Sequence, residues 1–424
     1  MEVSSGPART FLFLQGMASG FFDRLGRDLA ARGHRVHRIN FNGGDRLFWS
    51  LAHAVDYRGA PAQWPAFLEA RLDQWAVTDL VLFGDCRPLH KAAIAVAEAR
   101  GLPVHVAEEG YIRPDWITLE AGGVNDRSSM PRDPAWFLAE AKAVPMPAEP
   151  RQVRGSFLRR AVQDVLYNLA SEAMGWRYQA YKTHRPWHPF VEYAGWLKRF
   201  AFGRAARVRS AEAVQRLEAS GRPYYFHPLQ LDCDYQIREH SPFKRIAPAL
   251  EAVLASFAAH APSEALLVIK EHPLDNWLTD WRRMTAAIAR RHGVGDRVVY
   301  LEEGHLQSLI SGARGVVTVN STVGVVALGL GRPTAALGKA IYDMDRLTFQ
   351  GGIDAFWTDA APPDPVVFEA FRKVVTARTQ VNGDFFSEAG LAAAVQGAAD
   401  RLEAAGPALR DARAPRAEAA CRQA

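Results

Sequence analysis

The stretch GVVTVNSTVGVVALGLG (315–331) contains an apolar run, a turn of small polar residues and a second apolar segment. The run GVVTV is typical of a buried strand, and Asn, Ser and Thr directly after it are typical of a helix start. A strand that leads through a short turn into a helix is the repeating unit of parallel α/β sheets. The stretch therefore predicts one such unit, with a polar turn between its strand and its helix.

The same alternation of strand and helix extends in both directions from this stretch. In the second half of the chain the predicted strands are 223–230, 265–273, 297–302, 315–321 and 333–338, with helical sequence such as 246–260 between them. In the first half they are 10–15, 35–41, 79–85 and 103–110, with helices at 21–33 and 91–101. We therefore predict an α/β protein with two Rossmann-like halves and a cleft between them.

Length and composition agree with this class. The chain has 424 residues, of which 48% are apolar and 23% are charged, as in globular proteins. No uncharged apolar run reaches the length of about 18 residues that spans a bilayer, and the N-terminal stretch does not read as a signal peptide. Cys86, Cys233 and Cys421 are too widely spaced for a disulfide framework or a zinc motif. We therefore expect a cytosolic protein.

Positive charge is concentrated in one segment. Residues 151–210 contain twelve Lys or Arg and three Asp or Glu, a balance of +9, so the remainder of the +5 chain sums to −4. Eleven aromatic residues lie in the same segment. This mixture suits an anionic membrane surface or single-stranded nucleic acid. It is equally compatible with a helical hairpin that has aromatic residues in its core and Arg on its outside.

These patterns predict four regions. We expect an N-terminal Rossmann-like domain over 1–150, a basic aromatic helical segment over 151–215, and a C-terminal Rossmann-like domain over 216–375. A C-terminal helix and a frayed tail would occupy 376–424. If the basic segment docks on anionic lipid, we expect it to do so through Arg199, Arg204, Arg207 and Arg209.

Polar clusters follow many of the predicted strands. Ligands of open α/β sheets bind beyond the carboxyl ends of the strands, so these clusters are the first candidates for a site. They are QGMASGFF (15–22), FGDCRP (83–88), EEGYIRPDW (108–116), FHPLQLDCDYQI (226–237), KEHP (270–273) and NSTVG (320–324).

Two of the clusters have the chemistry of a phosphate site. At NSTVG, free backbone N–H groups and the helix N-terminus favour an anion, although Ser321 or Thr322 could equally be an ordinary helix cap. Lys270 and His272 end another strand and would suit a nucleotide phosphate, whereas KEHP alone would also fit a solvent-facing loop.

Carboxylates end one predicted strand in each half of the chain. Glu108 and Glu109 precede Gly110 in the first half, and Asp232 and Asp234 follow a strand in the second. A carboxylate pair is what glycosyl transfer uses, because its transition state resembles an oxocarbenium ion. The alternative for each of the four is structural capping of a neighbouring helix.

Taken together, these clusters resemble the KpsS/LipB family of capsule polysaccharide biosynthesis proteins. The matching stretches keep a single order between about residue 11 and residue 357. They are FLQGMASGFFDRLG, FGDCRPLHKAA, EEGYIRPDWITLEAGGVN, YFHPLQLDCDYQIREHSPF, IKEHPLD, NSTVGVVALGLGRPTAALGKAIYD and LTFQGGIDAFW.

The resemblance implies a function and a fold. Members of this family are retaining glycosyltransferases that move β-Kdo, an acidic sugar, from CMP-Kdo to a phosphatidylglycerol-type lipid, the start of the linker that carries capsule for export. The implied fold is GT-B-like, with the acceptor side in the first domain and the donor nucleotide mainly in the second. The implied location is cytoplasmic, peripheral on the inner membrane. A second Kdo transferase and the capsule export machinery are implied partners; nucleic acid and a cofactor are not.

The resemblance also implies residue roles. Asp234 would be the nucleophile that forms a covalent Kdo intermediate, with Asp232 as the competing choice; on an extended segment the two would point to opposite faces. Glu108 would be the general acid/base, and Arg113 would bind the Kdo carboxylate or an acceptor oxygen. The cytidine monophosphate would be held by Lys270, His272, Asn320, Ser321, Thr322 and Gly324.

Three alternatives remain at this point. Asp232-Cys233-Asp234 reads as D-x-D, but no other hard oxygen ligands have suitable spacing, so no metal is expected. A CDP-glycerol-type glycerophosphotransferase would use a similar H-P turn and phosphate turn without a carboxylate nucleophile. A non-catalytic capsule export component would need no opposed ionisable groups.

Overall fold

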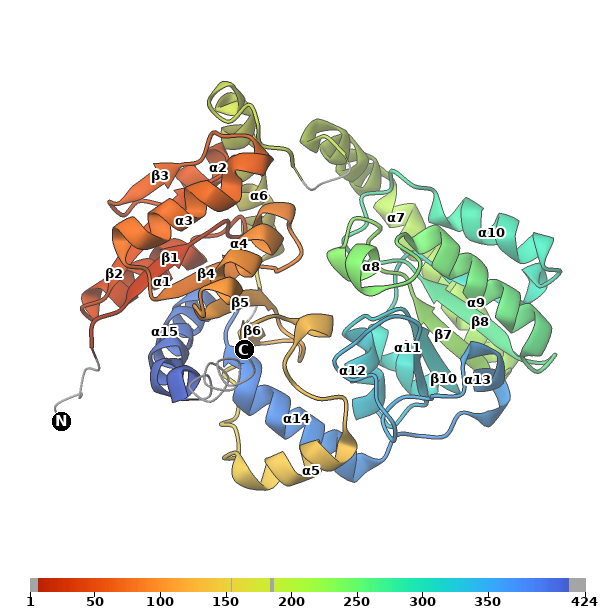
Figure 1. Ribbon diagram of the computed structural model, residues 1–424. Helices are drawn as coiled ribbons and strands as arrows, with labels where there is room; N and C mark the ends of the chain where they lie inside the picture. Colours follow the sequence, from red (N-terminus) through yellow and green to blue (C-terminus); the bar gives the residue numbers. More distant parts are fainter. Residues whose placement is uncertain (1–6, 154, 184–186, 412–424) are drawn as a thin grey trace. The chain divides into compact units, whose positions relative to one another are not determined.

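The computed structural model describes residues 7–153, 155–183 and 187–411, without the side chains of 406–411. The described chain forms two compact units (Figure 1). The N-terminal unit combines Met1–Ser129 with Pro147–His184 and Val375–Ala424, and the second unit combines Met130–Met146 with Arg185–Val374. The boundaries therefore differ from the predicted ones: the basic segment is divided between the units, and the C-terminal segment belongs to the first. Cys421 and the tail from 412 onward lie outside the described residues.

The N-terminal unit is built on a seven-stranded sheet in the order β12-β6-β5-β4-β1-β2-β3. Strands β1 to β5 run parallel, whereas β6 and β12 are antiparallel to their neighbours. The strands are β1 (Thr10–Phe13), β2 (Arg35–Asn40), β3 (Ala54–Asp56), β4 (Asp79–Phe83), β5 (Val104–Glu109), β6 (Trp116–Ala121) and β12 (Gln380–Asn382). The predicted strands of this half are confirmed. The sequence did not reveal β3, β6 and β12, which lie at or near the edges of the sheet.

Helices cover both faces of this sheet, because successive side chains of a strand point to opposite faces and both sets are apolar here. Phe11 and Phe13 of β1 pack in one buried cluster with residues of α1 and α15. Leu12, which points to the other face, is equally buried, and α3 and α4 pack against each other. The helices of this unit are α1 (Phe21–Ala31), α2 (Gly43–Leu47), α3 (Trp64–Trp75), α4 (Pro88–Ala99), α6 (Phe157–Ala173) and α15 (Glu388–Asp411), with 3-10 turns at Pro61–Gln63, Asn125–Arg127 and Gly175–Arg177.

The second unit contains a fully parallel five-stranded sheet in the order β11-β10-β7-β8-β9. Its strands are β7 (Tyr224–Pro228), β8 (Leu266–Lys270), β9 (Val298–Leu301), β10 (Gly315–Thr318) and β11 (Thr334–Ala336), each inside a predicted strand. The helices are α5 (Pro134–Ala143), α7 (Pro189–Ser220), α8 (Tyr235–His240), α9 (Ile246–His260), α10 (Trp281–Arg291), α11 (Leu306–Gly312), α12 (Val323–Gly329) and α13 (Ile353–Asp359), with a 3-10 turn at Gly295–Arg297; α14 (Pro365–Thr379) belongs to both units.

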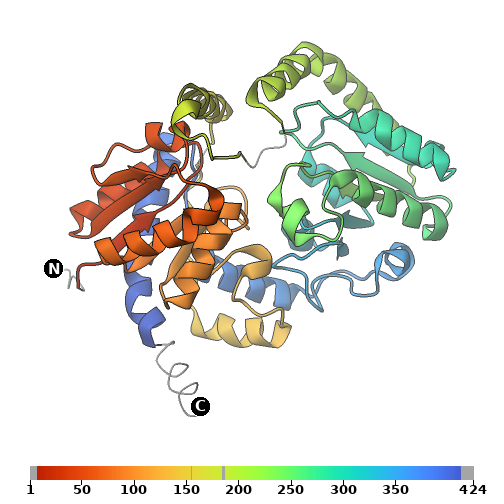
Figure 2. The ribbon, with the colours of Figure 1, turned by 45° about the horizontal axis from the view of Figure 1, so that its top comes forward.

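Successive side chains of β8 point to opposite faces of the sheet and show which helices cover each face. Leu267 and Ile269 pack with α9, α10 and α13, and Figure 2 shows α9 and α10 side by side over the sheet. Leu266 and Val268 pack on the opposite face with residues of α7, α11 and α12. A parallel sheet with both faces buried explains why its strands read as continuous apolar runs.

Both units have the same strand order. Numbered within its own unit, the parallel part of each sheet runs 3-2-1-4-5, the order of a Rossmann fold. The order reverses between β1 and β4 in the first unit and between β7 and β10 in the second. The prediction of an α/β protein with two Rossmann-like units is confirmed.

The basic segment forms two helices, α6 in the N-terminal unit and α7 in the second. Glycines allow α6 to pack closely on α2: a Cβ added to Gly43 would clash with the carbonyl oxygen of Ala170, and one on Gly44 would clash with the ring of Tyr167. No helix among the described residues has the length and apolar character to cross a membrane.

A buried histidine joins the two central strands of the second sheet. The Nδ1–H of His227 in β7 donates a hydrogen bond to the Val317 carbonyl of β10 over 2.7 Å. Burial lowers the pKa of His227 to about 4, although this hydrogen bond opposes the shift. The ring is therefore neutral near pH 7, and protonating it requires a charge in the core.

The packing of α6 on α2 leads to the first prediction. Gly43→Ala should destabilise the protein by about 1–3 kcal/mol, because the new methyl group forces α6 away from α2. Gly20→Ala is the matched control, since Gly20 has φ −73° and a Cβ there would meet no atom within 4 Å. Urea unfolding measures both variants, and equal stability of the two would contradict the close packing.

His227 leads to a prediction on pH. Its folded-state pKa lies below the ordinary value of 6.5, so the unfolded chain binds more protons between these values and stability falls as the pH falls. From pH 7 to pH 5 the loss from this group should be about 2 kcal/mol. His227→Asn keeps a donor near the Nδ1 position and should reduce the difference between unfolding free energies at pH 7 and pH 5 by that amount. An unchanged difference would show that the ring is not held neutral.

Candidate functional site

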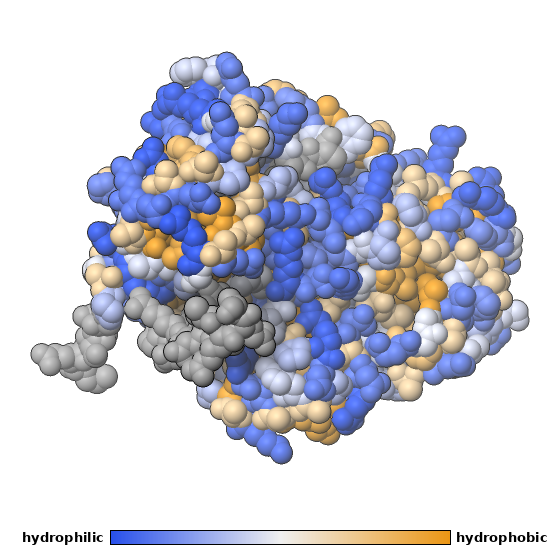
Figure 3. Space-filling view, viewed as in Figure 1, coloured by the Kyte–Doolittle hydropathy of each residue, from blue (hydrophilic) through white to orange (hydrophobic). Residues whose placement is uncertain are grey.

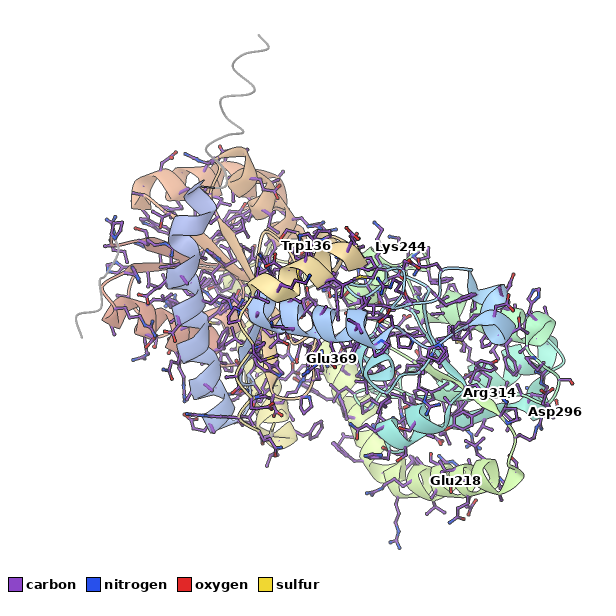
Figure 4. The ribbon with its side chains drawn as sticks, turned by 90° about the horizontal axis from the view of Figure 1, so that it is seen from below. Trp136, Glu218, Lys244, Asp296, Arg314 and Glu369 are labelled. Carbon is purple, nitrogen blue, oxygen red and sulfur yellow. The ribbon has the colours of Figure 1, made fainter. Side chains whose placement is uncertain are left out.

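The carboxyl ends of β7, β8 and β10 bring several predicted site residues to one edge of the second sheet. Because the strands are parallel, the segments after Pro228, Lys270 and Thr318 all leave at this edge. Lys270 itself ends β8 at this edge, and the segments that follow carry Asp234, His272 and the NST turn. Figure 4 shows Lys244, in the loop before α9 at this edge, well separated from Arg314 and Asp296, which precede β10 and β9 at the other.

Two buried side-chain amides join β7 and β10 where the strand order reverses. Gln230 Nε2 donates to Asn320 Oδ1 over 3.0 Å, and the backbone N–H of Asn320 donates to Gln230 Oε1 over 3.1 Å. Asn320 Nδ2 donates to the carbonyls of Gln236 and His240 in α8, over 2.7 and 3.2 Å. The Asn320 side chain, predicted as a nucleotide contact, thus holds α8 at the end of β10.

Asp232 and Asp234 each accept a hydrogen bond from a different helix. Asp234 is the N-cap of α8 and accepts from the N–H of Gln236 over 2.9 Å. Asp232 accepts from the N–H of Ile246, the first residue of α9, over 2.7 Å, and pairs with Arg245. The segment is not extended as expected, since Asp232 and Cys233 form a turn closed by Asp234 N–H and the Leu231 carbonyl. Capping, the alternative considered for these carboxylates, is therefore present at both.

Lys270 is the last residue of β8, and His272 lies two residues beyond it. Lys270 is buried, and its Nζ donates to the carbonyl of Glu271 over 3.2 Å. Burial lowers the pKa of Lys270, an effect that the nearby Glu303 opposes. His272 Nδ1 accepts from the N–H of Leu274 over 3.1 Å, so the neutral ring carries its proton on Nε2. The ammonium group of Lys270 and the N–H of His272 are both donors from which a phosphate oxygen can accept a hydrogen bond.

Glu271, between these two residues, points into a buried network. Its carboxylate accepts from Tyr300 Oη over 2.6 Å and from the indole N–H of Trp277, and Arg199 Nη1 lies 3.4 Å away. Burial raises the pKa of Glu271 to about 7, although the hydrogen bonds from Tyr300 and Trp277 lower it. The Glu271 side chain therefore points into the protein interior, where its hydrogen bonds stabilise the segment that carries Lys270 and His272.

The NSTVG turn is shaped by its own hydrogen bonds and by Tyr342. Ser321 Oγ accepts from the N–H of Val323 over 3.2 Å, a helix-capping contact, whereas Thr322 makes no such side-chain contact. Tyr342 Oη donates to the Ser321 carbonyl over 2.6 Å. A Cβ on Gly324 would clash with the Tyr342 ring. Gly324 is thus required for the packing of Tyr342. The hydrogen bond from Tyr342 to the Ser321 carbonyl then stabilises the NSTVG turn.

Glu108 and Arg113 belong to the N-terminal unit. Glu108 lies near the carboxyl end of β5, and a Cβ on Gly84, which has φ +67°, would lie 3.3 Å from Glu108 Oε2. Arg113 is exposed, and its Nε donates to the Gly110 carbonyl over 3.1 Å. A Cβ on Gly110 would clash with the Trp116 carbonyl oxygen, which explains glycine after the two glutamates.

Sequence reasoning missed several residues that build the edge of the second sheet. Gln230, Glu271 and Tyr342 lay inside the matching stretches, but only the strand order shows what they contact. Arg199 was expected on a membrane-facing surface and is instead buried. Arg209 was expected there too, but pairs with Glu302 over 2.8 Å. Of the four arginines in that prediction, Arg204 and Arg207 are the exposed ones.

Comparisons with known proteins agree with the motifs. A family model described as capsule polysaccharide biosynthesis protein matches residues 78–386. The capsule polysaccharide export protein KpsS of Escherichia coli is 34% identical over 383 residues, which cover 89% of this chain and 97% of that protein. The capsule polysaccharide modification protein LipB of Neisseria meningitidis serogroup B is 34% identical over 396 residues, 90% of this chain and 92% of that protein.

Among solved structures, KpsC of Thermosulfurimonas dismutans, a β-Kdo 2,7 transferase, aligns with a TM-score of 0.46 at 13% identity, covering 92% of this chain and 99% of that one. The sequence matches span most of this chain and nearly the full length of the relatives. On these matches, the chain belongs to the capsule polysaccharide biosynthesis protein family.

Proposed function

We propose that this protein is a retaining glycosyltransferase that moves β-Kdo from CMP-Kdo to a phosphatidylglycerol-type lipid, starting the linker for a capsular polysaccharide. The observation that carries the proposal is the placement of Lys270, His272 and the NST turn at the carboxyl edge of one parallel sheet. They flank the reversal of strand order between β7 and β10, where α/β folds bind nucleotides. The choice of Kdo as the sugar and of a lipid as the acceptor follows from the family membership and the resemblance described above.

In this proposal the phosphate of CMP contacts Lys270 and His272, and the hydroxyl groups of Ser321 and Thr322 in the NST turn contribute to the same site. Asp234 attacks the anomeric carbon of Kdo, the bond from that carbon to the CMP phosphate oxygen breaks, and CMP leaves. The acceptor hydroxyl then attacks the Kdo carbon and releases Asp234, and Glu108 takes the hydroxyl proton. Arg113 is the proposed contact for the Kdo carboxylate or an acceptor oxygen.

Two other functions make different predictions. A CDP-glycerol-type glycerophosphotransferase would accept CDP-glycerol and would not depend on Asp234. A non-catalytic export component, in keeping with the name of KpsS, would bind capsule without turnover. Incubation with CMP-Kdo or CDP-glycerol and a phosphatidylglycerol analogue, followed by mass spectrometry of the lipid, separates all three.

A lipid acceptor calls for a contact with the cytoplasmic surface of the inner membrane. On α6 the exposed apolar residues Leu158, Val162, Leu166 and Leu169 recur at helical spacing, and Trp176, which is 71% exposed, follows the helix. The opposite side of α6 packs on α2 through Gly43 and Gly44. This is the pattern of a helix that lies along a membrane surface.

Helix α7 has a similar division in the second unit. Ala206, Ser210 and Leu217 are buried on one side, while Leu197, Phe200 and Val208 are exposed on the other. Arg204 and Arg207 lie on the exposed side. On the face seen in Figure 3, hydrophilic side chains predominate, and smaller apolar patches are scattered among them. Apolar residues mixed with arginine favour a surface of anionic lipid.

The nucleophile can be tested with two matched variants. Asp234→Asn should abolish transfer while preserving the fold, because asparagine caps a helix as well as aspartate does. Asp232→Asn makes the same change at the α9 cap and should keep transfer. Intact-mass analysis of the wild-type protein with CMP-Kdo should show a Kdo adduct that Asp234→Asn lacks. Activity in Asp234→Asn with loss in Asp232→Asn would move the role to Asp232.

The membrane contact can be tested by vesicle cosedimentation. Replacing Arg204 and Arg207 with Gln should weaken binding to phosphatidylglycerol vesicles about 30-fold, since each cation near such a surface contributes about 1 kcal/mol. Replacing the exposed Arg283 and Arg290 of α10 removes the same charge elsewhere and should have little effect. Equal binding of the wild type to phosphatidylcholine vesicles, or binding that does not fall with salt, would contradict electrostatic docking.

A further inference from the structure

Helix α7 packs directly against the loop that follows β8. A Cβ on Gly195 would clash with the carbonyl oxygen of Asn276, so glycine is what allows the helix backbone to approach the loop this closely. Lys198, one residue before Arg199, donates from Nζ to the Trp277 carbonyl over 3.2 Å. Gly195 and Arg199 are four residues apart and therefore share one face of the helix. This face is the one turned toward the loop.

Arg199 binds the loop backbone on both sides of Pro273. Its Nη1 lies 2.6 Å from the Asp275 carbonyl oxygen and 3.5 Å from that of His272. The guanidinium carbon lies 5.4 Å from the centre of the Trp277 ring. A planar guanidinium can bridge such acceptors at once, because its N–H groups diverge in a fixed plane.

Carboxylates surround the same guanidinium. Glu271 Oε1 lies 3.4 Å from Nη1, and Glu303 Oε1 lies 3.4 Å from Nη2. Glu271 is held in turn by Tyr300 of β9 and by Trp277. Asp275 accepts from the indole N–H of Trp281 over 3.0 Å. The turn that carries Lys270 and His272 is thus fixed from α7, β9 and α10 together.

We infer that Arg199 is a positioning residue for the donor site: it holds the backbone of residues 271–275 so that Lys270 and His272 face the donor phosphate. The inference rests on the proposed function, which assigns the phosphate to these two residues. It follows that α7 has two roles, with an inner face that orders the donor turn and an outer face available to lipid. A helix that only packed against the sheet would need neither the close approach of Gly195 to Asn276 nor a buried guanidinium that binds the carbonyls of His272 and Asp275.

The test compares the binding of CMP and of cytidine, measured by isothermal titration calorimetry. Arg199→Lys keeps the charge but loses the planar group, and it should weaken CMP binding about tenfold while changing cytidine binding little. Cytidine lacks the phosphate, so a general loss of structure would weaken both ligands alike. Arg209→Lys is the matched control on the same helix, because Arg209 pairs with Glu302 rather than with the turn. This control should leave the ratio of CMP to cytidine affinity unchanged.

Each outcome decides the matter. If Lys270→Ala weakens CMP binding and Arg199→Lys does not, the positioning role is overturned while the proposed donor site stands. If the wild type binds no CMP, the proposed function fails and this inference fails with it. If Arg199→Lys does not fold, Gly195→Ala forces α7 away from the loop and so weakens the contacts of Arg199 with the Asp275 and His272 carbonyls. It should lower the same affinity ratio, and an unchanged ratio would overturn the inference.

Discussion

The hydrogen bonds between Gln230 and Asn320 are the interaction on which the candidate site depends. They form because β7 and β10, far apart in sequence, are neighbours in the sheet. Through Asn320 they also hold α8, whose N-cap is Asp234. A buried amide that lost one of these partners would leave polar groups without hydrogen bonds, at a cost of about 1–3 kcal/mol each. The pair therefore keeps the ends of two strands and one helix in a fixed arrangement.

Close backbone approaches are the second constraint. Gly43 allows α6 to pack on α2, Gly195 allows α7 to pack on the loop after β8, and Gly324 makes room for Tyr342. At each position a methyl group would overlap another atom, so the glycine is required by packing rather than by an unusual backbone angle. Two of these contacts fix the helices of the basic segment to separate units, and the third shapes the predicted phosphate turn.

Charge in the basic segment is divided by the fold into inward and outward groups. Arg199 is buried and lies beside Glu271 and Glu303, and the half-buried Arg209 pairs with Glu302, whereas Arg204 and Arg207 are exposed. A buried guanidinium that orders a loop and an exposed one that attracts lipid look identical in composition. The net charge of the segment therefore predicts a basic surface but overstates the number of arginines exposed on it.

The sequence by itself determined the α/β class, all of the central strands and the family. These signals are local: apolar runs of strand length, polar turns after them, and motifs in one order. Tertiary structure alone decided β6 and the edge strands β3 and β12, the division of the chain into units, and which arginines are buried. It also showed that Asp232 and Asp234 both accept hydrogen bonds from helix N-termini. Asn320 binds the backbone of α8, and Gly324 allows Tyr342 to pack against the NSTVG turn. These features depend on contacts between segments far apart in the chain, and a local pattern of residue types does not encode which distant partner a side chain meets.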